Sequence, residues 1–213
     1  MVSRTRTKAD TLFAMISLAT TPILIFLPAA MRIPYYRRTT VEGVTTIADA
    51  VQACNHSGLK GWDLVTYAQN MVSRKFATYS CRNLWDPPGR AFAYGMGYCT
   101  QYNLALKRIL DQLGFQTKAV YALKTKFEDN PAWNMGHTWV QVTIDGEVRE
   151  VCASRETNMP GEINFTPLSP VHQGHELILL LTHLGLILYA GLLEWGALLT
   201  GREVPDWMFV PPE

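Results

Sequence analysis

Cys99 is the residue of this 213-residue chain that best fits a nucleophile. It lies in the stretch Gly97–Asn103, GYCTQYN, shortly after a glycine and where helical spacing begins. The first turn of a helix presents unpaired N–H groups and a partial positive charge, which favour a thiolate and lower the pKa of a cysteine. The same N–H groups can hold the oxyanion that forms when sulfur attacks a carbonyl. The alternative is that Cys99 is a small buried residue without chemistry.

A catalytic thiol needs a base within hydrogen-bond reach of its sulfur, and His137 is the best candidate. It begins an extended run in the central part of the chain. The other histidines lie in an early loop or in the apolar segment near the end: His56, His172, His175 and His183. We therefore expect His137 to remove the proton of Cys99 and to return it to the leaving group.

The segment that begins at Cys99 has the spacing of an amphipathic helix. Its inward residues recur at steps of three and four: Cys99, Tyr102, Leu106, Ile109 or Leu110, and Leu113. Gly114 fits the left-handed residue that ends a helix, and a strand is expected over Phe115–Ala122. Two earlier helices and two loops are also predicted: helices over Thr45–Ala53 and Gly61–Phe76, loops around Asp86–Gly89 and over Lys124–Asn134.

A two-residue turn at Asp145-Gly146 predicts a β-hairpin within Gly136–Ser154. In such a turn Ile144 pairs with Glu147, which fixes the register of both strands. Side chains alternate between the two faces of a sheet. One face should therefore carry four side chains, with the last diagonal to the first: His137, Trp139, Glu150 and Cys152.

Apolar residues concentrate at the two ends of the chain. Residues 11–31 carry no charge over about twenty positions, enough for a helix to cross the roughly 30 Å hydrocarbon core. Residues 177–199 are apolar except for His183 and Glu194. We predict a transmembrane helix over 11–31 and a second transmembrane or membrane-associated helix over 176–200. The alternatives are a cleaved signal peptide for the first segment and a buried helix for either.

Residues 40–168, between these segments, are enough for one domain with its own core. Residues 1–10 form a basic tail, and residues 201–213 form a C-terminal tail. Two spans would make a membrane hairpin with both tails on one side. Basic residues flank the first segment on both sides, so the positive-inside rule nearly cancels. The prediction places the tails in the cytoplasm and the central domain outside it.

The composition limits the partners and cofactors that are expected. The net charge is +1 and charged residues make up only 17% of the chain, so nothing favours nucleic acid as a partner. The cysteines and histidines show no C-x-x-C or H-x-x-x-H spacing. We therefore expect neither a metal nor a cofactor. Cys54 and Cys81 are either a buried pair or a disulfide.

The order of these features over Met96–Ser154 resembles the transglutaminase-like superfamily. The shared features are Gly-x-Cys at a helix start, a helix ending in Leu-Gly-Phe, a strand, and His-x-Trp-Val before a hairpin. The resemblance implies an α+β domain with the papain-like cysteine fold, in which Cys99 matches the motif Cys and His137 the motif His. A looser resemblance exists to the arylamine N-acetyltransferases, which share a Cys-His-Asp plan. The His-x-Trp motif favours the first family.

The resemblance breaks at Cys152, which stands where the family normally has an Asp. An Asp would orient the imidazole and stabilise its charged form, whereas a thiol does this poorly unless it ionises. Three interpretations stay open. Catalysis could use a Cys-His dyad helped by Glu150 or Ser154. Alternatively, Cys152 could form a disulfide with Cys99 in an oxidising compartment, or the site could be degenerate.

We therefore predict a membrane-anchored cysteine enzyme that attacks an amide or ester carbonyl through Cys99 and His137. It would be a protease, an amidase or an acyl transferase. Because the domain would lie beside a bilayer, peptide or protein substrates near the membrane are expected. The competing prediction is a catalytically degenerate membrane protein that keeps the fold for binding or assembly, with Cys152 as its main support.

Overall fold

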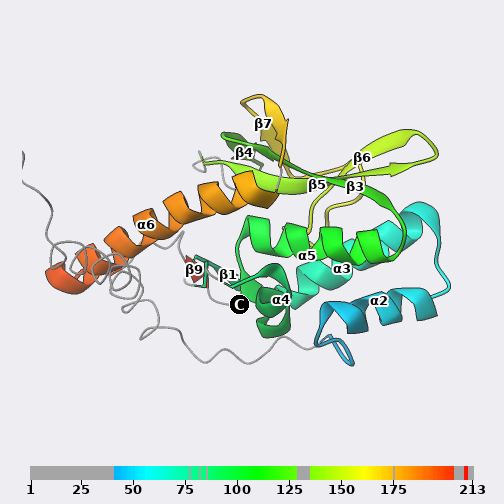
Figure 1. Cartoon of the computed structure of the whole chain (residues 1–213), viewed down its shortest axis with the longest axis horizontal. Helices are drawn as coiled ribbons and strands as arrows, with labels where there is room; N and C mark the ends of the chain where they lie inside the picture. Colours follow the sequence, from blue (N-terminus) through cyan, green and yellow to red (C-terminus); the bar gives the residue numbers. More distant parts are fainter. Residues whose placement is uncertain are drawn as a thin grey trace, which may run out of the picture.

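Helix α5 (Cys99–Gln112) lies at the centre of the fold, between an antiparallel sheet on one side and helices on the other (Figure 1). The computed structural model describes residues 41–76, 78–81, 83–84, 86–128, 135–174, 176–203 and 209–210. Leu106 and Ile109 of α5 are fully buried, and they share one hydrophobic core with Val140 of the sheet. The chain is therefore an α+β protein, as the sequence predicts.

Helices α2 (Ile47–His56) and α3 (Gly61–Lys75) pack against α5. The first turn of α2 is closed by a capping box. The Asp49 N–H donates to Thr46 Oγ1 (3.2 Å), and the Asp49 carboxylate accepts from the Thr46 N–H (2.7 Å). These bonds satisfy N–H groups that have no partner inside the helix. The sequence predicts both helices, and the structure confirms them with small shifts at their ends.

Helix α4 (Pro88–Tyr94) forms where the sequence predicts a loop, so that prediction is wrong. Proline breaks the interior of a helix but suits its first turn, where an N–H has no partner anyway. Gly95 ends the helix with φ 69°. Beside α4, a small sheet has the order β2-β1-β9 and contains β1 (Thr78–Ser80), β2 (Met96–Gly97) and β9 (Phe209–Val210).

Helix α5 ends where the glycine signal places its end. Gly114 has φ +88°, and the Phe115 N–H donates to the Leu110 carbonyl (3.1 Å). This bond satisfies one of the carbonyls left open at a helix end. The chain then enters β3 (Gln116–Ala122), which confirms the predicted strand.

The main sheet has the order β6-β5-β3-β8. Its central hairpin joins β5 (His137–Ile144) and β6 (Glu147–Val151), and β8 (Val171–Gln173) forms the other edge. Ile144 pairs with Glu147 and Gln141 with Glu150, so the predicted register is confirmed.

A short strand lies inside the segment that the sequence predicts as a loop over residues 124–134. Strand β4 (Thr125–Phe127) pairs with β7 (Phe165–Pro167), so the loop prediction is wrong at these residues. The partner strand is distant in the sequence, and such pairing leaves little local signal. The end of the predicted loop, 129–134, lies outside the described residues.

The C-terminal helix α6 (Glu176–Thr200) runs from the sheet to the far side of the molecule (Figure 1). Within the part of the chain that the structure describes, no helix has the length and apolar character needed to cross a bilayer. The predicted span over 176–200 is therefore not supported. Ile187 and Ala190 of α6 are instead buried in the core of the domain. The other predicted span, 11–31, lies outside the described residues.

Candidate active site

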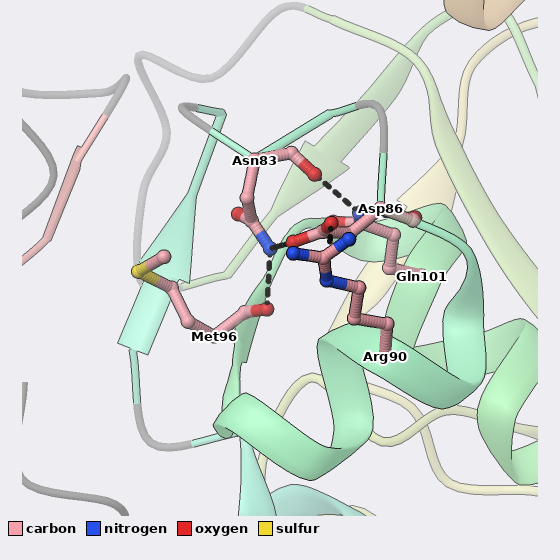
Figure 2. A network of polar contacts seen from close by, with 5 residues as sticks. All are labelled: Asn83, Asp86, Arg90, Met96 and Gln101. Carbon is pink, nitrogen blue, oxygen red and sulfur yellow. Dashed lines mark hydrogen bonds and ion pairs between the residues drawn. The ribbon is translucent and has the colours of Figure 1, made fainter. Parts of the chain in front are cut away.

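Cys99 is the first residue of α5, and a polar network holds this end of the helix in place (Figure 2). The Gln101 side chain accepts from the Tyr98 N–H (3.1 Å) and donates to the backbone carbonyls of Asn83 and Asp86 (2.8 Å each). The loop before α4 is thereby tied to the first turn of α5. The position of the Cys99 backbone is fixed by this network rather than by the helix alone.

The same network extends to the loop and to the short strand before α5. The Asn83 amide donates to the Met96 carbonyl (2.9 Å), and Asp86 forms an ion pair with Arg90 (3.2 Å). Gly97 follows directly and leaves no room for a side chain. A Cβ atom there would lie 2.7 Å from Gln101 Oε1 and 3.0 Å from the ring of Phe76.

The Cys99 side chain is buried, with 7% of its surface exposed. Its Sγ lies 3.9 Å from Thr100 Oγ1, which lies 3.1 Å from Thr138 Oγ1 on β5. Burial raises the pKa of the Cys99 thiol to about 11, although hydrogen bonds from the Thr138 backbone and from Thr100 act in the opposite direction. The sequence predicts a lowered pKa at the helix start. That prediction is wrong because desolvation of the thiolate outweighs the helix N-terminus.

His137 is the first residue of β5, and only 3% of its surface is exposed. Four aromatic rings surround it, with ring centroids 4.6 Å away for Phe165, 5.0 Å for Phe127, 6.3 Å for the stacked Trp139 and 6.4 Å for Tyr102. This apolar setting lowers the pKa of His137 to about 3. The imidazole is therefore neutral at ordinary pH, and with this pKa it is a weak base.

Cys152 lies directly beside His137, as the hairpin register predicts. His137 Nε2 is 3.2 Å from Cys152 Sγ, and Cys152 donates its S–H to Ser154 Oγ (3.2 Å). With the S–H directed to Ser154, a lone pair of the sulfur faces Nε2, and this arrangement favours the imidazole tautomer that is protonated at Nε2. That tautomer has its basic lone pair at Nδ1.

Further polar groups hold the Cys152 sulfur and its neighbours. Ser154 donates to Asn164 Oδ1 (3.2 Å), and the Asn158 amide donates to the Cys152 carbonyl (3.1 Å). Burial raises the pKa of Cys152, which keeps it a neutral thiol. The Ser154 part of the dyad hypothesis thus has a contact in the structure, through Cys152.

Glu150 makes no hydrogen bond to His137 among the described residues, so the structure gives it no part in a Cys99–His137 dyad. It accepts hydrogen bonds from Trp139 Nε1 and from Gln141 Nε2, the latter at 2.9 Å. All four cysteines are free thiols, so neither the Cys99–Cys152 nor the Cys54–Cys81 disulfide is present. Among the residues that the structure describes, no group of three or more His, Cys, Asp or Glu side chains is arranged to hold a metal ion.

Asn103 is a structural link that the sequence analysis missed. Its amide donates to the Thr138 carbonyl (2.7 Å) and to Cys152 Sγ (3.5 Å), and its oxygen accepts from the Ala153 N–H (3.0 Å). One side chain of α5 therefore joins β5, which begins at His137, to the residues directly after β6, where Cys152 lies. Asn103 lies one helical turn after Cys99 and is fully buried. The available signal was an amide four residues after Cys99, on the inward face of the predicted amphipathic helix.

Cys99 and His137 line the same cavity, which has a volume of about 170 Å³. The described residues show no hydrogen bond between Cys99 Sγ and the imidazole of His137. Thr100 and Thr138, the neighbours of Cys99 and His137 in the sequence, also line the cavity. A carbonyl in the cavity could meet the thiol, the imidazole and the N–H groups at the start of α5 together.

Comparison with known proteins adds one match in sequence and one in structure. Residues 95–150 match the sequence model of the N-acetyltransferase family, a segment that includes Cys99 and His137 but not Cys152. The curated proteins give no match.

One solved structure is similar, that of a proposed cysteine protease from Cytophaga hutchinsonii. The sequence identity is 11%, the TM-score is 0.39, and the match covers 64% of this chain and 52% of that one. This chain thus spans about half the length of that protein. The match to the N-acetyltransferase model, together with the geometry of Cys99 and His137, supports a papain-like cysteine fold around α5 and the hairpin.

Proposed function

We propose that this protein is a cysteine-dependent acyl transferase or hydrolase of papain-like type. Cys99 is the nucleophile and His137 is the general base. The observation that carries the proposal is that both side chains line one cavity at the N-terminus of α5. A thiol, a neutral imidazole and a set of helix N–H groups are the parts that attack on a carbonyl requires.

The reaction begins when an ester, thioester or amide carbonyl enters the cavity. His137 Nδ1 takes the thiol proton while Cys99 Sγ bonds to the carbonyl carbon. The N–H groups at the start of α5 receive the negative oxygen of the tetrahedral intermediate. As this intermediate collapses, the imidazolium gives its proton to the leaving group, and a thioester on Cys99 remains. An amine or water then attacks the thioester, with His137 removing its proton.

The electrostatics favour proton transfer during the attack over a preformed ion pair. Burial raises the pKa of Cys99 to about 11 and lowers that of His137 to about 3, so both groups are neutral at rest. Separating charge in the empty cavity is costly because the site is desolvated. The charge forms only when a substrate supplies the electrophile.

Transfer to an amine is the favoured second step. The support is the match of residues 95–150 to the N-acetyltransferase model, which covers the nucleophile and the base. Acetyl-CoA is on this basis the first acyl donor to test. Cleavage of a peptide or protein amide is the other outcome that Cys99 chemistry allows.

Membrane association stays part of the proposal. The support is the uncharged segment 11–31 and a row of exposed leucines on α6: Leu188, Leu192 and Leu199. The proposal places the central domain outside the cytoplasm, next to peptide or protein substrates at the bilayer. Sedimentation of membranes after a carbonate wash, followed by protease protection of intact vesicles, tests both parts.

The deciding experiment is acylation of the purified full chain by p-nitrophenyl acetate and by acetyl-CoA, read by intact mass and peptide mapping. One acetyl group should appear on Cys99, and it should be absent from Cys99→Ala. His137→Gln should slow the labelling by roughly 10²-fold or more, the usual size of general-base assistance. The control variant Cys54→Ala removes a buried thiol of α2 and should label normally. Labelling that is spread over several cysteines would overturn the proposal.

A second candidate is a non-enzymatic protein that keeps the fold for binding or assembly. The observation in its favour is the thiol of Cys152 beside His137, where the resemblance leads one to expect a carboxylate. The same experiment separates the two. A folded wild-type chain that acylates no faster than Cys99→Ala would favour the binding role.

A further inference from the structure

We infer that the cavity beside Cys99 binds the acyl part of the substrate, and that this acyl group is apolar, uncharged and no larger than about seven carbons. The inference rests on the proposed function, since it takes Cys99 as the nucleophile. It adds the chemical class of the group that becomes attached to the sulfur.

The walls of the cavity carry no charge among the residues that the structure describes. Tyr79, Tyr121 and Met135 come from the domain, and Leu179 and Leu186 come from α6. A carboxylate or ammonium group placed here would lose its water without gaining an opposite charge. Burying an unpaired charge is strongly unfavourable, whereas an alkyl or aryl group gains free energy when it leaves water.

The volume of the cavity sets the upper size limit. At about 170 Å³, it is close to the ~150 Å³ apolar cavity that accommodates benzene in another protein. Acetyl, butanoyl, hexanoyl and benzoyl groups fit this space, and a decanoyl chain exceeds it. A longer chain would have to extend beyond the apolar walls of the cavity into solvent, where its additional methylenes gain no burial.

Of the groups that take part in the reaction, we assign the acyl group to this cavity. It stays bonded to Cys99 Sγ through both half-reactions, whereas the leaving group and the acceptor must exchange between them. A pocket of limited volume therefore restricts the acyl group that stays on the sulfur, whereas the leaving group and the acceptor exchange through its open side.

Helix α6 supplies the wall that can be tested most cleanly. Leu179 is 4% exposed and packs on Gly174, where a Cβ atom would lie 2.9 Å from Leu179 Cδ1. Leu186 is partly buried against the core and lines the cavity. Leu188, on the same helix, is 51% exposed and does not line the cavity, which makes it a matched control.

The experiment compares p-nitrophenyl esters that share one leaving group: acetate, butanoate, hexanoate, benzoate, decanoate and the mono-ester of succinate. The rate constant for acylation of Cys99 in the full chain is divided by the rate constant with glutathione, which removes intrinsic reactivity. We expect this normalised rate constant to rise roughly fourfold for each added methylene up to hexanoate. It should fall at decanoate, and its value for the succinate mono-ester should be more than about tenfold lower than for butanoate.

Variants then assign the selectivity to the cavity wall. Leu186→Trp fills the cavity and should reduce the hexanoate-to-acetate ratio to near one, whereas Leu188→Trp should keep the wild-type ratio. If Leu186→Trp does not fold, Leu179→Ala takes its place in the test. This variant enlarges the cavity and should move the highest normalised rate to a longer acyl chain. Equal normalised rates for succinate and butanoate would overturn the inference, as would the same profile in Leu186→Trp and Leu188→Trp. If no ester acylates Cys99, the proposed function itself fails. If all esters acylate Cys99 at similar normalised rates, only the inference about the acyl group fails.

Discussion

His137 Nε2 lies 3.2 Å from Cys152 Sγ, so a thiol occupies the place beside the base where a carboxylate is expected. Burial raises the pKa of Cys152, and the sulfur therefore carries no charge that could stabilise an imidazolium. The contact favours the tautomer of His137 that is protonated at Nε2, with the lone pair on Nδ1. Cys152 thus orients the His137 imidazole without raising its pKa.

Replacing Cys152 with Asp should supply the missing charge. The carboxylate would accept from His137 Nε2 and from the Asn103 amide, which now contacts the sulfur. An adjacent opposite charge raises a histidine pKa by about 1–3 units, so alkylation of Cys99 by iodoacetamide at pH 6 should speed up by roughly tenfold or more. Cys152→Asn has nearly the same shape without the charge and serves as the control. Equal alkylation rates in the two variants would show that a negative charge at position 152 does not increase the reactivity of Cys99.

The wild-type thiol should titrate at high pH. Because burial raises the pKa of Cys99 to about 11, the rate of its alkylation should rise about tenfold per pH unit between pH 7 and 10 and show no plateau below pH 9. Peptide mapping after timed labelling measures this rate for each cysteine. In denaturant the same thiol should titrate near 8.5. A plateau below pH 7 in the folded protein would instead reveal a preformed thiolate–imidazolium pair.

The buried imidazole should make the fold sensitive to acid. The folded-state pKa of His137 is lowered to about 3 from 6.5, so between these values the unfolded chain binds the proton and the folded chain does not. Stability contributed by this group is present above about pH 6.5 and is lost as the pH falls towards 3. The loss could reach about 5 kcal/mol.

Urea unfolding between pH 3 and 8 measures this acid limb. His137→Phe, which keeps an aromatic ring among Phe127 and Phe165, should flatten the limb, whereas the exposed His56→Gln should leave it unchanged. An acid limb of the same slope in His137→Phe would place its origin in other groups.

Gly97 should tolerate no side chain while Gln101 keeps its present position. In Gly97→Ala the new Cβ would meet Gln101 Oε1 at 2.7 Å, and overpacking of this kind costs roughly 1–3 kcal/mol. Thermal unfolding should therefore show a lower Tm and weaker acylation of Cys99. The double variant Gly97→Ala, Gln101→Ala should recover only part of this loss relative to Gln101→Ala, because the new Cβ would still lie 3.0 Å from the Phe76 ring and 3.2 Å from the Cβ of residue 101. Gly89→Ala, whose Cβ would meet only Ile47 at 3.9 Å, is the control.

The sequence predicts the chemistry-bearing half of the fold well because its signals are local. The helical spacing after Cys99, the glycine at its end and the Asp-Gly turn each act within a few residues, and together they bring His137 beside Cys152. Strand β4 and helix α4 were missed for opposite reasons. The first depends on a distant partner strand, and the second on prolines that can either break or begin a helix.

The electrostatics of the site could not be predicted from the order of residues. A helix start predicts a lowered pKa for Cys99, but burial in the folded chain raises this pKa instead. The apolar character of α6 is likewise plain in the sequence, while its packing against the domain is not. Burial of this kind arises only when distant segments meet.

The walls of the cavity and its reacting groups also join the fold at different stages. Helix α5 and the hairpin place Cys99 and His137 through contacts that are short in sequence, and local contacts form early in folding. Leu186 belongs to a helix synthesised later, and Tyr79 lies on β1, which pairs with the still later β9. During synthesis the Cys99 thiol should therefore be exposed to solvent until the later segments of the chain pack over it. A newly made chain is for that interval most vulnerable to oxidation or to capture by the wrong electrophile.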